Sequence, residues 1–229
     1  AHEFKNALAT ISGYAQMIHS DPVAADTAEN AAKILDQTRN VTHVVTEFLR
    51  YARPLDISAE PVALASLVER VVTEIAELFP QVQIATDGAF AEVAGDDGLL
   101  RQVLLNLVRN AAEAAFAASS RPSVTVHGEI LSSPSDGAQR IYIRDNGVGI
   151  SSEALPKLFL PFFTTKASGT GLGLAIVQKI LLQHGGQVEA RNGSRGGSGA
   201  EIHEGAEFIV TLPATRQISE AVESKEVAI

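Results

Sequence analysis

Apolar residues recur every three or four positions in the first quarter of the chain, in two stretches that predict two helices. The first stretch covers residues 2–20 and ends at Asp21-Pro22. The second begins at Asp26 or Thr27 and runs to Arg53, just before Pro54. The repeating positions are Phe4, Leu8, Ile11, Ala15 and Ile18 in the first helix, and Ile34, Thr38, Val41, Val45, Phe48 and Ala52 in the second.

Both apolar seams are narrow, and two helices of this kind cannot bury themselves. Heptad spacing of this type is typical of helical bundles. We therefore expect an antiparallel hairpin that pairs with a second copy of itself as a homodimeric four-helix bundle. The alternative is a hairpin packed against the rest of its own chain.

After residue 62 the pattern changes to strands interleaved with helices. Helices are expected at 64–79, 96–119 and 170–184, and strands at 82–86, 123–131, 140–145, 187–192 and 207–212. This order predicts an α/β sandwich, a mixed sheet covered by helices on one face. The expected organisation is a hairpin over 1–54, a linker over 55–62, a second domain over 63–213 and a tail over 214–229, with a glycine-rich loop at 193–205.

Composition narrows the range of possible functions and partners. The net charge of -9 argues against nucleic acid as the main partner, because phosphate backbones demand a basic surface. No apolar stretch approaches the roughly 20 residues that span a bilayer. We expect no membrane contact from this fragment and a cytoplasmic location. The chain begins with Ala1 rather than Met, so any membrane anchor of a longer protein is expected upstream.

His2 is the first residue with candidate chemistry. At roughly 100° per residue, it lies about 160° from the centre of the apolar seam, on the outer helix face. Asn6, Ala9 and Gly13 continue the same face, mostly with small side chains. A neutral imidazole is a nucleophile near physiological pH, and Glu3 is placed to hold one ring N–H. An exposed helical histidine is by itself more often only solvated.

A second group of candidates falls on the long helix and on two glycine-rich turns. Asn106 and Asn110 are four residues apart, hence on one helix face. Asp145-Asn146-Gly147-Val148-Gly149 follows a predicted strand, where an Asp can accept from an amine and glycines let the backbone approach a flat ring. Gly169-Thr170-Gly171-Leu172-Gly173-Leu174 opens a predicted helix, whose N–H groups suit phosphate. Neither a dinucleotide fingerprint nor a Walker A sequence is present.

Together, these segments and Phe159-x-x-Phe162-Phe163 resemble the N, G1, F and G2 boxes of the GHKL ATP-binding fold. Histidine kinases, type II topoisomerases and a heat-shock chaperone share that fold. With His2-Glu3-Phe4-Lys5-Asn6 at the start, the order resembles the catalytic core of bacterial sensor histidine kinases of two-component systems. The resemblance covers nearly the whole chain.

The resemblance implies a role for each matching position. Asp145 would bind the adenine amine, with Gly147 and Gly149 along the base. Asn110 would coordinate Mg²⁺. Thr170, Gly171 and Gly173 would hold the ATP phosphates, and Lys166 would neutralise phosphate charge from a short lid, residues 164–168. His2, helped by Glu3, would accept the phosphoryl group and pass it to an Asp of a response-regulator receiver domain. Asn6 would orient water for receiver dephosphorylation.

The residue type at position 106 distinguishes ATP-hydrolysing members of the fold from the kinases. ATP-hydrolysing relatives usually carry a Glu there to activate water, and Asn is a poor base, so the resemblance favours transfer to His2. Two departures stand out: Ala7 replaces a frequent Pro, and Glu113 stands where some relatives have a basic residue. The alternatives are a GHKL ATPase and a non-catalytic ATP-binding scaffold. The histidines at 19, 43, 127, 184 and 203 show no metal-ligand spacing.

Overall fold

The computed structural model describes residues 2–20, 27–52, 54, 57–131, 137–166, 169–193 and 205–214. For residues 2–8, 19, 20, 28, 40, 43 and 50 it describes the backbone alone. The chain divides into two compact units, residues 1–54 and 55–229. The segment between the predicted strands 123–131 and 140–145, the predicted lid and the glycine-rich loop lie partly outside the described residues. The predicted tail lies outside them except for Ala214.

The first unit is a helical hairpin, formed by α1 (His2–Ser20) and α2 (Thr27–Ala52), which pack against each other. Several large apolar side chains of the hairpin are exposed: Met17, Leu35, Val45, Phe48 and Leu49. Thr38, a position of the predicted seam, is exposed together with Thr42 and Thr46. The hydroxyls of these three threonines each donate to the carbonyl four residues earlier. The two predicted helices are confirmed.

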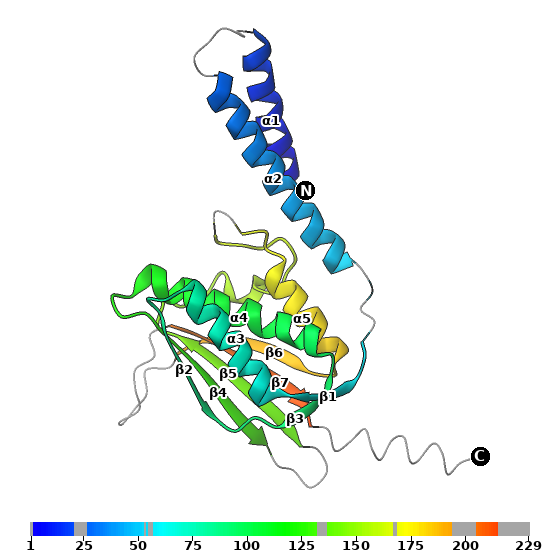
Figure 1. The fold of residues 1–229 in the computed structure, drawn as a ribbon, viewed down its shortest axis with the longest axis vertical. Coiled ribbons are helices and arrows are strands. Elements are labelled where there is room, and N and C mark those ends of the chain that lie inside the picture. The colour runs from blue at the N-terminus through cyan, green and yellow to red at the C-terminus, as the bar shows by residue number, and fades with distance from the viewer. Residues whose placement is uncertain are drawn as a thin grey trace, which may run out of the picture. The chain divides into compact units, whose positions relative to one another are not determined.

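The second unit is a five-stranded mixed sheet with three helices on one face (Figure 1). The sheet order is β2-β4-β5-β7-β6, in which only the β2–β4 pair is parallel. The strands are β2 (Gln83–Gly88), β4 (Ser123–Leu131), β5 (Ala138–Asp145), β6 (Gln187–Asn192) and β7 (Ala206–Pro213). The helices are α3 (Leu64–Leu78), α4 (Asp97–Ala118) and α5 (Gly173–Gln183). The predicted fold class, a hairpin followed by an α/β sandwich, is confirmed.

Strand alternation explains why one sheet face is covered. In β4 and β5, Val124, Val126, Ile141 and Ile143 are buried beneath the helices, while the residues between them are only half-buried. An antiparallel pair with this period presents one face to the core and the other to solvent. The helices pack on this face through apolar stripes whose residues are three or four positions apart. On α3 these residues are Leu64, Leu67, Val68, Val71 and Ile75.

A small second sheet was not predicted. β1 (Glu60–Ala63) pairs antiparallel with β3 (Glu92–Gly95), although the sequence pattern placed most of β1 in a linker. Four-residue strands carry too few positions for an alternation signal, and tertiary pairing decides them. Buried Gln139 fixes the chain between β2 and β3: its Oε1 accepts from the Ala91 N–H at 2.7 Å, and its Nε2 donates to the Ala89 carbonyl. A short 3₁₀ turn, η1 (Leu155–Lys157), follows the first glycine turn.

Candidate nucleotide site

Helix α4 carries the two predicted asparagines. It begins behind Asp96, whose side chain accepts from the Leu99 N–H at 2.9 Å as an N-cap. Its buried residues face the sheet and α3, which leaves Asn106 and Asn110 half-buried on another side. A β-carbon built on Gly173 would lie 3.3 Å from Asn106 Oδ1. The fold thus brings Asn106 to the start of α5.

Asp145 ends β5 and is almost completely buried, with 3% of its surface exposed. Its Oδ1 accepts from the N–H groups of Gly147 at 2.8 Å and Ala206 at 3.2 Å. Burial raises the pKa of the Asp145 carboxyl above its ordinary value, although these two hydrogen bonds act in the opposite direction. Both hydrogen bonds end on Oδ1, and neither uses Oδ2, the second oxygen of the carboxylate.

The first glycine turn packs against α4. A β-carbon on Gly147 would lie 2.8 Å from the carbonyl oxygen of Ala114, so only glycine fits between β5 and the helix. Gly149 has a φ of +73°, a conformation that other residues rarely adopt. The structure therefore requires both glycines for packing and turn geometry, whatever else they bind.

The second glycine turn, residues 169–174, packs against the backbone of the phenylalanine motif, Phe159-x-x-Phe162-Phe163. Gly171 has a φ of +67°, and a β-carbon there would lie 2.5 Å from the backbone carbon of Phe162. The Phe162 N–H donates to the Gly171 carbonyl at 2.9 Å, and Phe162 itself has a φ of +65°. Helix α5 consequently begins at Gly173, so the expectation that it starts at Thr170 was wrong. The positive φ of Gly171 cannot continue a right-handed helix.

Lys166 joins this segment to α4. Its Nζ donates to Asn110 Oδ1 at 2.9 Å and forms an ion pair with Glu113. An amide oxygen already facing a cation suits Mg²⁺, which prefers oxygen ligands. In the described ranges, this site included, no group of three or more His, Asp or Glu side chains is placed to hold a metal ion.

The predicted phosphoacceptor residues lie in the other unit. The backbone of His2, Glu3 and Asn6 is helical, within α1. Their side chains lie outside the described residues, so the predicted outward face of His2 is not tested. Of the described helices, none combines the length and hydrophobicity needed to cross a membrane.

Three anchoring residues escaped the sequence analysis. Asn146 Oδ1 accepts from the Ser123 N–H at 2.9 Å, and its Nδ2 donates to the Arg121 carbonyl at 2.8 Å. Asn192 makes two hydrogen bonds at 2.7 Å with the backbone of Ile150. A β-carbon on Gly205 would lie 2.5 Å from Asp145 Oδ1. For Gly205, the glycine-rich composition of 193–205 was the available signal in the sequence. For Asn146 and Asn192 there was none, because a hydrogen bond from a side chain to a distant backbone group leaves no pattern in the sequence.

A row of charges crosses the sheet beside Asp145. Buried Glu207 on β7 pairs with Arg144 on β5 and Arg191 on β6, which are its register neighbours. Burial alone would raise the pKa of Glu207, but the hydrogen bonds and charges of the two arginines outweigh it and hold the pKa below its ordinary value.

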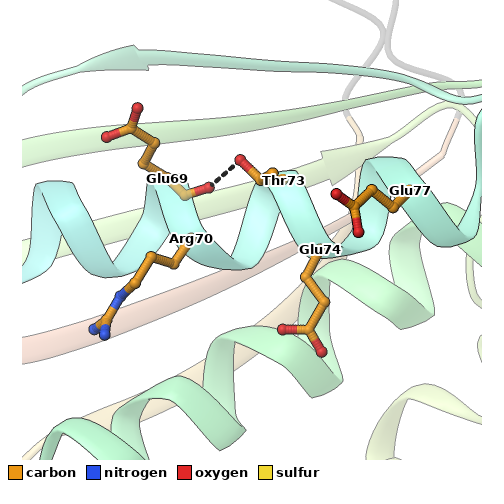
Figure 2. A pocket seen from close by; sticks show the side chains of 5 residues that line it. All are labelled: Glu69, Arg70, Thr73, Glu74 and Glu77. Atoms are coloured by element: carbon orange, nitrogen blue, oxygen red, sulfur yellow. Dashed lines mark hydrogen bonds between the residues drawn. The ribbon is translucent and has the colours of Figure 1, made fainter.

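A surface depression on α3 is not part of this site. It is lined by side chains of this helix alone, Glu69, Arg70, Thr73, Glu74 and Glu77 (Figure 2). Arg70 and Glu74 are engaged in ion pairs with Asp97 and Arg101 of α4. Three carboxylates and no glycine turn make this face a poor match for phosphate.

Two family models match the chain, one for each unit. Residues 95–216 match the histidine kinase-, DNA gyrase B-, and HSP90-like ATPases. Residues 1–56 match the His Kinase A (phospho-acceptor) domain. The first match contains both asparagines, both glycine turns and Lys166, and the second contains His2.

Named relatives agree with both matches. The signal transduction histidine-protein kinase AtoS of Escherichia coli (strain K12) is 34% identical over 97% of this chain and 35% of its own length. The sensor histidine kinase ZraS of Escherichia coli O157:H7 is 33% identical over 93% of this chain and 44% of its own. This chain therefore spans less than half the length of these relatives.

Solved structures support the same assignment. The histidine kinase ThkA in complex with the response regulator protein TrrA covers 95% of this chain and 60% of the solved chain, at 25% identity and a TM-score of 0.65. The mycobacterial sensor histidine kinase MprB covers 69% of this chain and 99% of the solved chain, at 25% identity and a TM-score of 0.60. This chain belongs to the histidine kinase-, DNA gyrase B-, and HSP90-like ATPases and, within them, to the sensor histidine kinases of bacterial two-component systems.

Proposed function

We propose that this chain autophosphorylates His2 from ATP and passes the phosphoryl group to an Asp of a response-regulator receiver domain. One observation carries the proposal: a single chain joins a phospho-acceptor hairpin containing His2 to an ATPase domain in which α4 and both glycine turns pack together. The solved complex of ThkA with a response regulator supports the choice of acceptor. Because the reaction draws on ATP, we place it in the cytoplasm.

Asp145 is proposed to recognise adenine. Its Oδ1 is occupied by the N–H groups of Gly147 and Ala206, which fixes the carboxylate and leaves Oδ2 as acceptor for the exocyclic amine. Gly147 and Gly149 would supply the backbone beside the base. A buried acceptor with no competing partner rejects ligands that cannot donate to it, because the unpaired group is then costly.

The phosphates are proposed to lie between α4 and the start of α5. Thr170, Gly171 and Gly173 precede or open that helix, whose free N–H groups favour anions. Asn110 would hold Mg²⁺, and Lys166 would add a positive charge. When bound, Mg²⁺ supplies charge neutralisation for phosphoryl transfer.

Asn106 argues for transfer to protein rather than to water. The side chain lies beside Gly173, where a carboxylate would be needed to take a proton from attacking water. An amide cannot accept that proton. His2 is then the proposed nucleophile: its neutral ring nitrogen forms the N–P bond as the bond to the ADP oxygen breaks, while Glu3 holds the other ring N–H. Asn6 is proposed to serve a second reaction, the dephosphorylation of the receiver, by orienting the attacking water.

The hairpin is proposed to form a homodimer. Four of its large apolar side chains, Met17, Leu35, Val45 and Leu49, are exposed and need a partner surface. A second copy supplies one by completing a four-helix bundle. Sedimentation equilibrium should give twice the chain mass, and a monomer at micromolar concentration would contradict the proposal.

The decisive experiment uses ATP labelled on the γ-phosphate. The chain should incorporate acid-labile, base-stable phosphate, His2→Gln should abolish it, and His19→Gln, a histidine change on the same helix, should not. Labelled phosphate that survives in His2→Gln refutes the assignment. Steady ATP turnover without phosphoprotein would instead indicate a GHKL ATPase, and nucleotide binding without either would indicate a scaffold.

Two variants with complementary defects, mixed at an ATP concentration too low for Asp145→Asn to bind, test the direction of transfer. His2→Gln retains its nucleotide site, and Asp145→Asn retains its phosphoacceptor. A mixed dimer becomes labelled only if one protomer phosphorylates the other. Adding a receiver domain to the labelled wild type should then move the label to the receiver.

A further inference from the structure

Two oxygen atoms of α4 converge on one cation. Lys166 Nζ is 2.9 Å from Asn110 Oδ1 and is paired with the Glu113 carboxylate. Asn110 and Glu113 are three residues apart, which puts them on the same side of the helix. The cation comes from the segment that precedes the second glycine turn, more than fifty residues away in sequence.

This pair has the donor chemistry of a hard-cation site. Mg²⁺ in nucleotide sites is usually held by one or two protein carboxylates or carbonyl oxygens, with the phosphates completing the shell. One amide oxygen and one carboxylate oxygen, converging on a single point, meet that description. A lysine ammonium is a compact charge that can occupy the same position.

The Lys166 contact is suited to exchange. The Lys166 and Glu113 side chains are 47% and 37% exposed, and ion pairs at such positions contribute little to stability. Charge also bears on Glu113. A carboxylate close to a bound triphosphate is repelled unless a cation lies between them. A cation held by Asn110 would lie beside Glu113 and remove this repulsion.

We propose that Asn110 and Glu113 form one cation site, which Lys166 fills in the protein without nucleotide and the nucleotide's divalent cation fills after binding. Glu113 is then a second metal-binding residue, and Lys166 is released towards the phosphates. This rests on the proposed nucleotide site. The competing explanation is that Glu113 serves only as the ion-pair partner of Lys166.

A double-variant series separates the two. Mg²⁺ is titrated against each variant at a fixed concentration of a fluorescent ATP analogue, and the midpoint is read as binding, without turnover. Lys166→Met removes the ion pair, so Glu113→Gln should have no further effect if Glu113 only holds Lys166. If Glu113 binds the metal, the double variant should need on the order of tenfold more Mg²⁺ than Lys166→Met alone, the scale seen when supporting groups of metal sites are lost.

Two controls complete the design. Glu77→Gln, the same charge change on the exposed face of α3 (Figure 2), should leave the Mg²⁺ midpoint unchanged. The affinity for Mn²⁺ in the presence of nucleotide, measured by electron paramagnetic resonance, should fall in Glu113→Gln by a similar factor. Equal midpoints for Lys166→Met and the double variant would overturn the inference. Absence of nucleotide binding by the wild type would overturn the proposed function instead.

Discussion

A β-carbon placed on Gly205 would overlap the carbonyl oxygen of Asp145 and lie 2.5 Å from its Oδ1. The next residue, Ala206, donates its N–H to that same Oδ1 at 3.2 Å. The start of β7 therefore holds the side chain that we propose recognises adenine. Because this contact is backbone against backbone, no rotamer change can make room for a larger residue.

Gly205→Ala should weaken nucleotide binding without touching the nucleotide. The added methyl group must push β7 away from Asp145, at a cost of about 1–3 kcal/mol in unfolding free energy. Calorimetric titration with ATP should show a lower affinity. Gly13→Ala is the matched control, since a β-carbon there meets nothing within 4 Å, and helix propensity favours it by about 1 kcal/mol. Equal ATP affinities for the two variants would contradict the proposed role of Gly205.

Asp145→Asn should separate stability from binding. The amide oxygen can still accept from Gly147 and Ala206, but an NH₂ group replaces Oδ2, the proposed acceptor for adenine. Loss of one charge-assisted hydrogen bond is worth about 1.5–3 kcal/mol, or about 10- to 100-fold in affinity. Binding of ATP is measured by calorimetry, and ADP should lose affinity by a similar factor.

The pH dependence of Asp145 has the opposite sign from that of a paired carboxylate. Its pKa is raised in the folded protein, so the folded state binds a proton more tightly than the unfolded chain does. Asp145 therefore lowers the unfolding free energy as pH rises from its ordinary pKa, 3.8, through the raised value. Asp145→Asn should be more stable than wild type at neutral pH, and this advantage should vanish in acid. Denaturant melts at several pH values test this, and an advantage that grows in acid would refute it.

Glu207→Gln should show the reverse pattern. The pKa of Glu207 is lowered by Arg144 and Arg191, so its charge stabilises the fold above the ordinary value of 4.5, and this stability is lost as pH falls through the lowered pKa. At neutral pH the change should cost about 3 kcal/mol, the low end for broken buried pairs, because Arg191 is largely exposed. The difference from wild type in denaturant melts should disappear at the acidic end. A constant difference across pH would exclude the ionic explanation.

His184→Leu should destabilise the second unit. The buried ring accepts from the Asp96 N–H through Nε2 at 3.0 Å, and its Nδ1 donates to the Ile180 carbonyl at 2.8 Å. Removing the acceptor leaves the half-buried N–H of Asp96 unpaired, which costs about 1–3 kcal/mol. His127→Leu is the control: its partner, Asp87, is exposed, so the loss should stay below about 1 kcal/mol. Thermal unfolding followed by calorimetry compares the two.

Local pattern was enough to predict most of this architecture. Heptad spacing predicted the two hairpin helices, and strict alternation along β4 and β5 predicted a sheet covered on one side. The pattern failed where a single backbone angle decided the outcome. Gly171 adopts a positive φ against Phe162, and α5 begins three residues later than its apolar spacing indicated.

The sequence by itself determined the kinds of chemistry present: an early histidine, two asparagines one turn apart, an Asp at a strand end and two glycine turns. Those features are local, because residue type and spacing along one element define them. Only the tertiary structure decided which of them meet. Lys166 reaches Asn110 and Glu113, Asn106 lies beside Gly173, and Gly205 packs on Asp145. Contacts between residues tens of positions apart depend on how helices and strands pack, and no short-range spacing encodes them.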